Sequence, residues 1–239
     1  LGGSVGTGDT PLEAEVVEFG DLAALMAAPD GSLAGKIAYV SNRMVRFKDG
    51  RGYGPAVGAR SNGAVEAAKK GALAVVIRSI GTSSDRFAHT GTMRYLPDVP
   101  RIPAAALSNP DADLLSHMLA RGKPVRLRLD ISAETVGEYT SHNVIAEVRG
   151  RELPDEVVTM GGHLDSWDLG TGAIDDGAGL GITAAARAPI RAPQRAPRRR
   201  ALFAPPRTPP EAARRRADAG LESLLKTRCD AALFQMKSA

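Results

Sequence analysis

The sequence predicts an α/β chain in two parts: a small mixed sheet with two or three helices over residues 10–133, and a strand–loop–helix unit over residues 137–187. In the first part, a helical pattern over Asn62–Lys70 leads directly into the apolar strand Ala72–Arg78, as in a helix packed on a buried sheet. In the second part, the hydrophobic strand Val157–Met160 ends at a polar, glycine-rich loop.

The other elements of the first part follow from hydrophobic periodicity and turn residues. Alternating apolar and basic residues from Val125 to Ile131 are typical of a half-buried strand. Asn109 is expected to cap a helix that ends near Leu119, because Pro110 fits the first helical position. We also expect strands at Ala14–Phe19, Lys36–Val40 and Ala104–Ser108, a helix at Leu22–Ala27, and a loop through Gly50, Gly52, Gly54 and Pro55.

The second part is expected to run from Asn143–Val148 through a turn at Gly150 to the strand Val157–Met160, and to contain a small-residue helix from Ala178 to about Arg187. Prolines then follow closely, and each would break the helix because it lacks a backbone N–H: Pro189, Pro193 and Pro197. The Arg- and Pro-rich tail over residues 188–239 is therefore expected to be disordered or translated out of frame.

The net charge of +4 comes from this tail. Residues 187–239 hold 13 Lys and Arg against 4 Asp and Glu, whereas residues 1–186 hold 18 against 23. The tail has almost no aromatic residues, so we expect no nucleic-acid partner. Cys229 stands alone, which excludes an intrachain disulfide. The sequence also shows no apolar run near the roughly 20 residues that span a bilayer and no signal segment at its start.

The residues that carry chemistry lie between His163 and Asp176, where one imidazole and four carboxylates occur within 14 positions. A divalent metal would balance that charge, and imidazole and carboxylate are zinc's usual non-thiol ligands. The spacing of two from His163 to Asp165 lets this carboxylate accept a hydrogen bond from the ring nitrogen that is not on the metal. Asp168 and Asp176 are equally consistent with ordinary turn and helix-start acids.

The run GHLDSWDLGTGAIDDGAG, preceded by NVIAEVRG, resembles the zinc aminopeptidase and carboxypeptidase superfamily known as the M28 peptidases. Upstream, GAVEAAKKGALAVVIRS, the His-Thr-Gly of residues 89–91 and VPRIPAAALS resemble the protease-associated domain inserted in some of its members. The resemblance implies a protease-associated domain over residues 10–133, and the first strand–loop–helix units of a zinc-exopeptidase α/β sandwich over residues 137–187.

The resemblance also implies a mechanism. Two zinc ions would share a bridging carboxylate and an activated water, with His163 on one zinc, Asp175 as the bridge and Asp165 orienting His163. Asp176 would follow Asp175 through a cis peptide. The substrate would be a dipeptide or a peptide end, hydrolysed without a side-chain nucleophile. Secretion to an extracellular or periplasmic location and a homodimer are further implications.

The family also needs a Glu-Glu pair some thirty or more residues after the bridging aspartate, and later an Asp and a His. This chain has neither the pair nor any histidine after His163. We therefore hypothesise a reading-frame shift near residue 187, and expect an incomplete, inactive metallopeptidase with weak or absent zinc binding. The alternative function is a non-catalytic interaction module built on the protease-associated domain.

One rival motif is Gly2–Gly6, whose GGSVG fits a hydrolase nucleophile elbow. The elbow requires a strand before the serine and a helix after it, and the sequence predicts neither. His89, His117 and His142 are expected to be structural or exposed.

Overall fold

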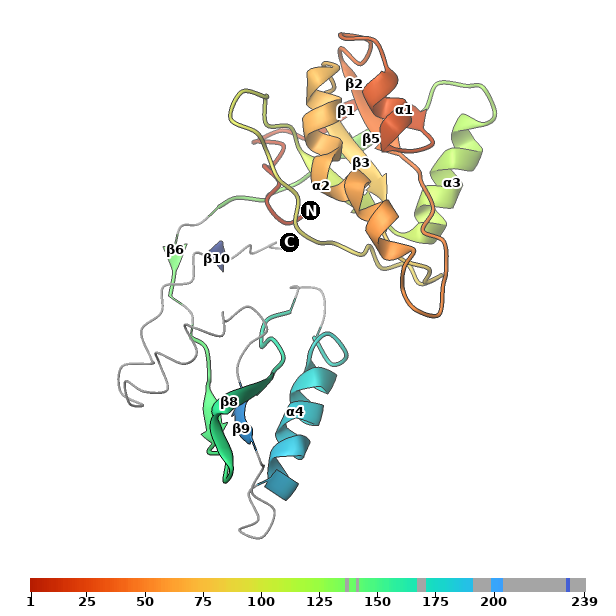
Figure 1. Cartoon of the computed structure of the whole chain (residues 1–239). Helices are drawn as coiled ribbons and strands as arrows, with labels where there is room; N and C mark the ends of the chain where they lie inside the picture. The colour runs from red at the N-terminus through yellow and green to blue at the C-terminus, as the bar shows by residue number, and fades with distance from the viewer. Residues whose placement is uncertain (136–137, 141, 167–170, 191–198, 204–230, 233–239) are drawn as a thin grey trace. The chain divides into compact units, whose positions relative to one another are not determined.

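The computed structural model describes residues 1–239 apart from 136–137, 141, 167–170, 191–198, 204–230 and 233–239 (Figure 1). The chain divides into two units, the first over Leu1–Val136 and the second over Gly137–Leu233. Among the described helices, none is both long and apolar enough to cross a membrane.

The first unit is built on a mixed five-stranded sheet in the order β4-β3-β2-β1-β5. The first four strands run parallel to their neighbours, and β5 pairs antiparallel with β1. The strands are β1 (Leu12–Phe19), β2 (Lys36–Val40), β3 (Ala74–Arg78), β4 (Ala104–Leu107) and β5 (Arg126–Leu129). The predicted α/β class and mixed sheet are confirmed.

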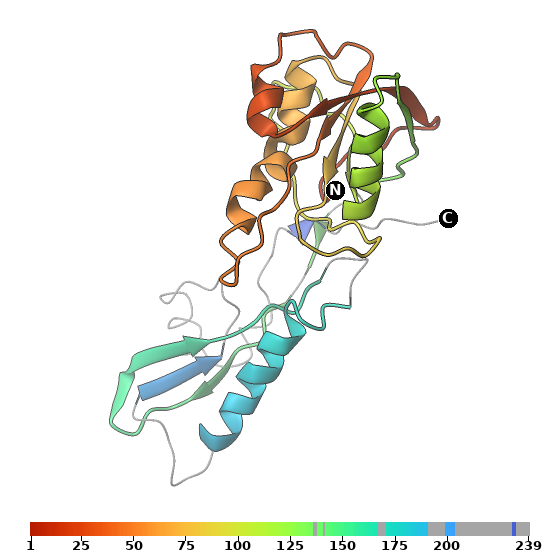
Figure 2. The same cartoon turned by 90° about the vertical axis from the view of Figure 1, so that its right-hand side faces the viewer.

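Three helices cover this sheet, α1 (Leu22–Ala27) and α2 (Tyr53–Lys69) on one face and α3 (Asn109–Leu119) on the other (Figures 1 and 2). Successive strand residues point to opposite faces, so β2 and β3 feed two separate cores. Val75 and Ile77 pack with α1 and α2, while Val76 packs with α3. Every residue of β3 is buried, as expected for a parallel strand covered on both sides.

Two predictions at helix starts are wrong. The helix predicted from Asn62 begins at Tyr53. Pro55 lies in its first turn, where the missing N–H has no intrahelical partner to lose, so the prolyl residue does not exclude helix. The cap of α3 is Ser108, whose hydroxyl accepts from the amide of Asp111, and Asn109 is already helical.

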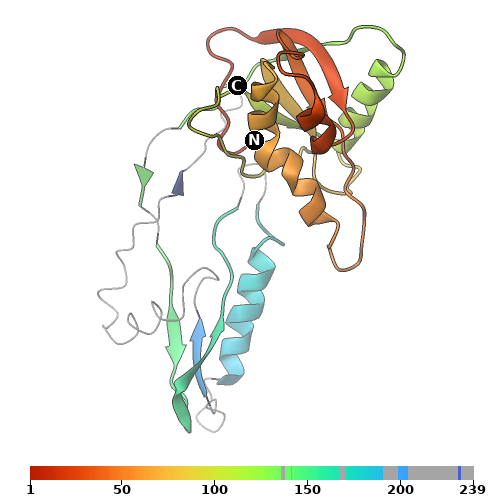
Figure 3. The same ribbon diagram turned by 45° about the horizontal axis from the view of Figure 1, so that its top comes forward.

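The second unit contains a three-stranded sheet in the order β7-β9-β8, with β9 antiparallel to β7 and parallel to β8. Its elements are β6 (Glu138–Tyr139), β7 (Ala146–Val148), β8 (Leu153–Met160), α4 (Gly177–Ile190), β9 (Arg199–Phe203) and β10 (Ala231–Ala232). Short strands β6 and β10 pair with each other. Figure 3 shows α4 running beside the three-stranded sheet.

Three expectations for this unit need correction. Strand β8 begins at Leu153 rather than Val157, and its register shifts between these residues, where Pro154 lies on an edge strand that tolerates a missing donor. Helix α4 continues past Pro189 to Ile190, so this proline falls in the last turn. The tail predicted to lack structure contributes β9, the central strand of the sheet. Pro193 and Pro197 lie outside the described residues.

A partly buried ion pair ties β3 to α3. Nη1 and Nη2 of Arg78 donate to the carboxylate of Asp113 at 2.6 and 3.3 Å, and Arg43 also contacts this carboxylate. The Arg78 side chain is only 6% exposed, whereas that of Asp113 is 33% exposed. The hydrogen bond from Arg78 lowers the pKa of Asp113, burial opposes this effect, and the charges of Arg78 and Arg43 lower the pKa further.

We predict that Asp113→Asn destabilises the protein by about 2 kcal/mol at neutral pH, because it leaves the Arg78 guanidinium buried without its counter-ion. A carboxyl whose pKa is lower in the folded state stabilises folding above its unfolded pKa of about 3.9. That stabilisation is lost as the pH falls from there through the folded pKa. Urea denaturation at pH 7 and pH 3 should therefore show a smaller difference between wild type and variant at the lower pH.

The control is Asp98→Asn, because Asp98 is exposed and has no ion pair among the described residues. The free energy of unfolding of this control should equal that of the wild type at both pH values. An Asp113→Asn variant that loses the same stability at pH 3 as at pH 7 would contradict the role of this ion pair.

Candidate metal centre at the end of β8

The predicted site lies between the carboxyl end of β8 and the start of α4. Strand β8 ends at Met160, and Gly161 and Gly162 lead to His163. The loop returns through Asp175 and Asp176, after which α4 begins at Gly177. In open α/β sheets ligands bind at this edge of the strands.

The loop brings His163 and Asp175 together, 12 residues apart in the chain. Nε2 of His163 lies 2.8 Å from Oδ1 of Asp175. The imidazole is 40% exposed and the Asp175 side chain 85% exposed, so both are open to solvent. One nitrogen and one oxygen donor of the kinds that zinc prefers thus meet at a point that a metal and its water can reach.

The other ring nitrogen faces Asp165. Nδ1 lies 2.8 Å from the main-chain oxygen of Asp165 and 3.2 Å from its carboxylate oxygen Oδ1. The predicted partner was the carboxylate; the main-chain oxygen is the nearer of the two. The hydrogen bond to this main-chain oxygen raises the pKa of His163 most; partial burial lowers it, and the contact with Asp175 raises it again.

The ring of His163 therefore lies between two acceptors. A carbonyl oxygen can only accept, so Nδ1 must be the donor to Asp165, and the neutral ring would present a bare Nε2 to Asp175. An ionised carboxylate also only accepts. Either the ring carries two protons, or a cation takes the place of the proton on Nε2. His163 and Asp175 therefore fit a metal ion bound at Nε2 in place of the proton.

Asp176 plays a different part from its neighbour. The peptide bond between Asp175 and Asp176 is cis. The Asp176 carboxylate accepts from the backbone amide of His163 at 3.2 Å, whereas Asp175 contacts the imidazole. It packs against two glycines: a β-carbon at Gly162 would lie 2.7 Å from its Oδ2, and one at Gly179 would overlap the carboxylate. Asp176 thus joins the end of β8 to the first turn of α4.

The sequence pattern alone does not predict this joining role of Asp176, although Gly162, Asp176 and Gly179 all lie within the motif. Asp168, the fourth carboxylate of the motif, lies outside the described residues. Within the part of the chain that the structure describes, no group of three or more His, Cys, Asp or Glu side chains is placed to hold a metal ion. His163 and Asp175 are thus two candidate ligands, fewer than the three that a metal-binding group needs here.

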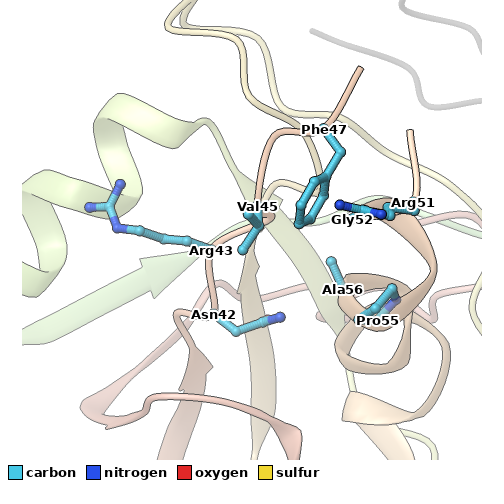
Figure 4. Close-up of a pocket in the computed structure, with 8 residues that line it drawn as sticks. All are labelled: Asn42, Arg43, Val45, Phe47, Arg51, Gly52, Pro55 and Ala56. Carbon is cyan, nitrogen blue, oxygen red and sulfur yellow. The ribbon is translucent and has the colours of Figure 1, made fainter. Parts of the chain in front are cut away.

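The first unit has hollows of its own. One, of about 330 Å³, lies beside the start of α2, and its lining residues are shown in Figure 4. There the Arg51 guanidinium lies 4.2 Å from the ring centre of Phe47. Another, of about 360 Å³, is lined by residues that include Arg78 and Asp113. Neither contains a residue predicted for catalysis.

Comparison with known proteins identifies the fold and the motif. Residues 143–204 match Peptidase family M28. A solved Peptidase M28 precursor from Shewanella amazonensis is 53% identical, with a TM-score of 0.82, over 85% of this chain and 46% of that chain. The chain belongs to peptidase family M28.

Curated relatives of this M28 chain are named carboxypeptidase Q. The protein from Xenopus laevis is 41% identical over 183 residues, and the one from Homo sapiens is 38% identical over 183 residues. Each alignment covers 77% of this chain, but only 38% and 37% of the relative. The chain thus spans less than two fifths of the length of these relatives.

The M28 match also corrects a predicted boundary. It continues to residue 204 and includes β9, so the family-like sequence does not end at residue 187.

We predict that Gly179→Ala destabilises the second unit by about 1 to 3 kcal/mol, because the new methyl group overlaps the Asp176 carboxylate. Gly181→Ala is the matched control, since a β-carbon there meets nothing within 4 Å in the same helix. It should be neutral or stabilising by up to about 1 kcal/mol, because alanine favours helix. Urea denaturation followed by circular dichroism compares the two; equal stabilities would show that Asp176 does not occupy this position.

Proposed function

We propose that this chain supplies His163 and Asp175 to the zinc centre of a metallo-exopeptidase that hydrolyses dipeptides or peptide ends. The observation that carries the proposal is the imidazole held between two acceptors, with Nδ1 at 2.8 Å from the Asp165 carbonyl and Nε2 at 2.8 Å from Asp175. A cation at Nε2 satisfies both the ring and the carboxylate. Membership of the M28 family supports zinc as that cation.

Each residue has a distinct role in this proposal. In a complete zinc centre, His163 would bind one zinc ion through Nε2, and the Asp175 carboxylate would be shared with a second. Asp165 is a positioning residue, because its oxygens hold the Nδ1 proton and so keep Nε2 free for the metal. Asp176 holds the main chain of His163 in place. When bound, zinc polarises the scissile carbonyl and lowers the pKa of the attacking water.

We further propose that the first unit is a protease-associated domain over residues 10–133, and that the peptidase domain begins near residue 137. The five-stranded sheet of the first unit has a core on each face, which supports independent folding of this unit. This observation also favours the second candidate function, a non-catalytic interaction module. The names of the carboxypeptidase Q relatives support a peptide substrate. An extracellular or periplasmic location and a homodimer are part of the same proposal.

Zinc binding by the full chain tests the first proposal. We expect one weakly held zinc ion and at least tenfold weaker binding in His163→Ala. Asp165→Ala should cause a smaller loss, because it removes the carboxylate but keeps the main-chain oxygen that lies nearest to Nδ1. The control is His142→Ala, since His142 is an exposed histidine of the same unit. Titration with zinc, followed by calorimetry, gives the affinities. Unchanged zinc binding in His163→Ala would contradict the ligand assignment.

We expect no dipeptide hydrolysis by this chain, because the acids after Asp176 are Glu211, Asp218, Glu222 and Asp230, none adjacent to another. Two tightly bound zinc ions with turnover that His163→Ala abolishes would instead identify a complete enzyme. Absence of both zinc and turnover would leave only the interaction module.

Because the family match reaches residue 204, we now place the hypothesised frame shift after that residue rather than near residue 187. We expect the coding DNA after codon 204 to encode an adjacent Glu-Glu pair in another frame. Resequencing tests this: an intact frame with no such alternative contradicts the hypothesis.

A further inference from the structure

A second cluster of polar side chains lies in the first unit, on α2 and on the loop between β3 and β4. Tyr53 and Arg60 are seven residues apart on α2, two turns along the same face. Nη1 of Arg60 donates to the Tyr53 hydroxyl at 3.0 Å and lies 3.5 Å from Nε2 of His89. The Tyr53 hydroxyl lies 3.3 Å from the same nitrogen. A guanidinium, a phenol and an imidazole therefore converge.

The Arg60 guanidinium has no counter-ion among the described residues, since no carboxylate there lies within ion-pair distance of it. Its Nε is buried without an acceptor. All of its hydrogen bonds to described residues are made by Nη1, which leaves Nη2 uncommitted. Loss of water without a compensating carboxylate is costly for a charge, so this group is one that an anion would stabilise.

The His-Thr-Gly segment of residues 89–91 holds the guanidinium in place. The carbonyl of Thr90 accepts from Nη1 at 3.5 Å. Gly91 leaves room for the group, because a β-carbon there would overlap its Nη1, Cζ and Nε atoms. The amide of His89 donates to the buried Ser79 hydroxyl at 2.7 Å, directly after β3. His89 and Thr90 thus contact the Arg60 guanidinium, and Gly91 leaves the space that it occupies. The hydrogen bond from His89 to Ser79 anchors the loop to the end of β3.

We propose that Arg60, held in place by Tyr53 and His89, binds the carboxylate group of a peptide or other organic acid. A guanidinium presents N–H donors in the plane that a carboxylate matches, and Nη2 of Arg60 makes no hydrogen bond to a described residue. The cluster supplies one permanent positive charge, which suits a monoanion better than a phosphate dianion. All of its residues lie in the first unit. None of them is a proposed zinc ligand.

The probe is N-acetyl-L-alanyl-L-alanine, which has a free carboxylate and no free amine, and its carboxamide is the neutral control. Titration of the full, zinc-free chain followed by amide NMR should show saturable shifts at residues 53 and 89–91 with the acid and none with the amide. Arg60→Gln should weaken the acid at least tenfold, since hydrogen bonds to charged groups carry about that much affinity.

Two further variants separate binding from folding. Gly91→Ala keeps every charge but displaces the guanidinium, and should also weaken the acid about tenfold. Arg94→Gln is the matched control: Arg94 bonds to Asn62 outside the cluster, and its removal should leave affinity unchanged. Equal binding of acid and amide, equal effects of Arg60→Gln and Arg94→Gln, or tighter binding of inorganic phosphate at these amides would overturn the proposal.

Discussion

The burial of β2 and β3 on both faces is the constraint on which the first unit depends. Each strand passes through the middle of the sheet, so its side chains must alternate between two cores without a solvent-facing side. Tyr39 shows how polar groups meet this condition, because its buried hydroxyl donates to the Ala112 carbonyl of α3 at 2.9 Å. The buried Arg78 guanidinium likewise donates to the Asp113 carboxylate of α3. The loops at the ends of these strands are thereby held in defined positions, including the one that carries residues 89–91.

The candidate metal centre depends on a more local constraint, the close approach of β8's end to the first turn of α4. The carboxylate of Asp176 occupies the space that side chains at Gly162 and Gly179 would need. This contact fixes the main chain of His163, and the Asp165 carbonyl then fixes its ring. Asp175 is left exposed beside Nε2. The two neighbouring aspartates thus have different contacts: Asp175 contacts the imidazole of His163, and Asp176 binds its backbone amide.

Each of the two proposed sites has an excess that a ligand of opposite character would balance. At His163 the surplus is of acceptors, so a cation completes the set. At Arg60 the surplus is of positive charge, so an anion completes it. At Arg78, by contrast, the Asp113 carboxylate already supplies the counter-ion. Imbalance of donors, acceptors and charge distinguishes a binding group from a structural one.

The sequence by itself determined the features that depend on neighbouring residues. Helix α1 and strand β2 have the predicted bounds, and the order of His163, Asp165 and Asp175 within a short motif indicated the family. Tertiary structure alone decided what depends on distant partners. Helix α2 begins at Tyr53, although the local glycines favour a loop, and β9 forms within an Arg- and Pro-rich stretch because β7 and β8 supply its hydrogen bonds. The roles of Asp176 and Arg60 follow from close approach across loops, which residue spacing does not encode.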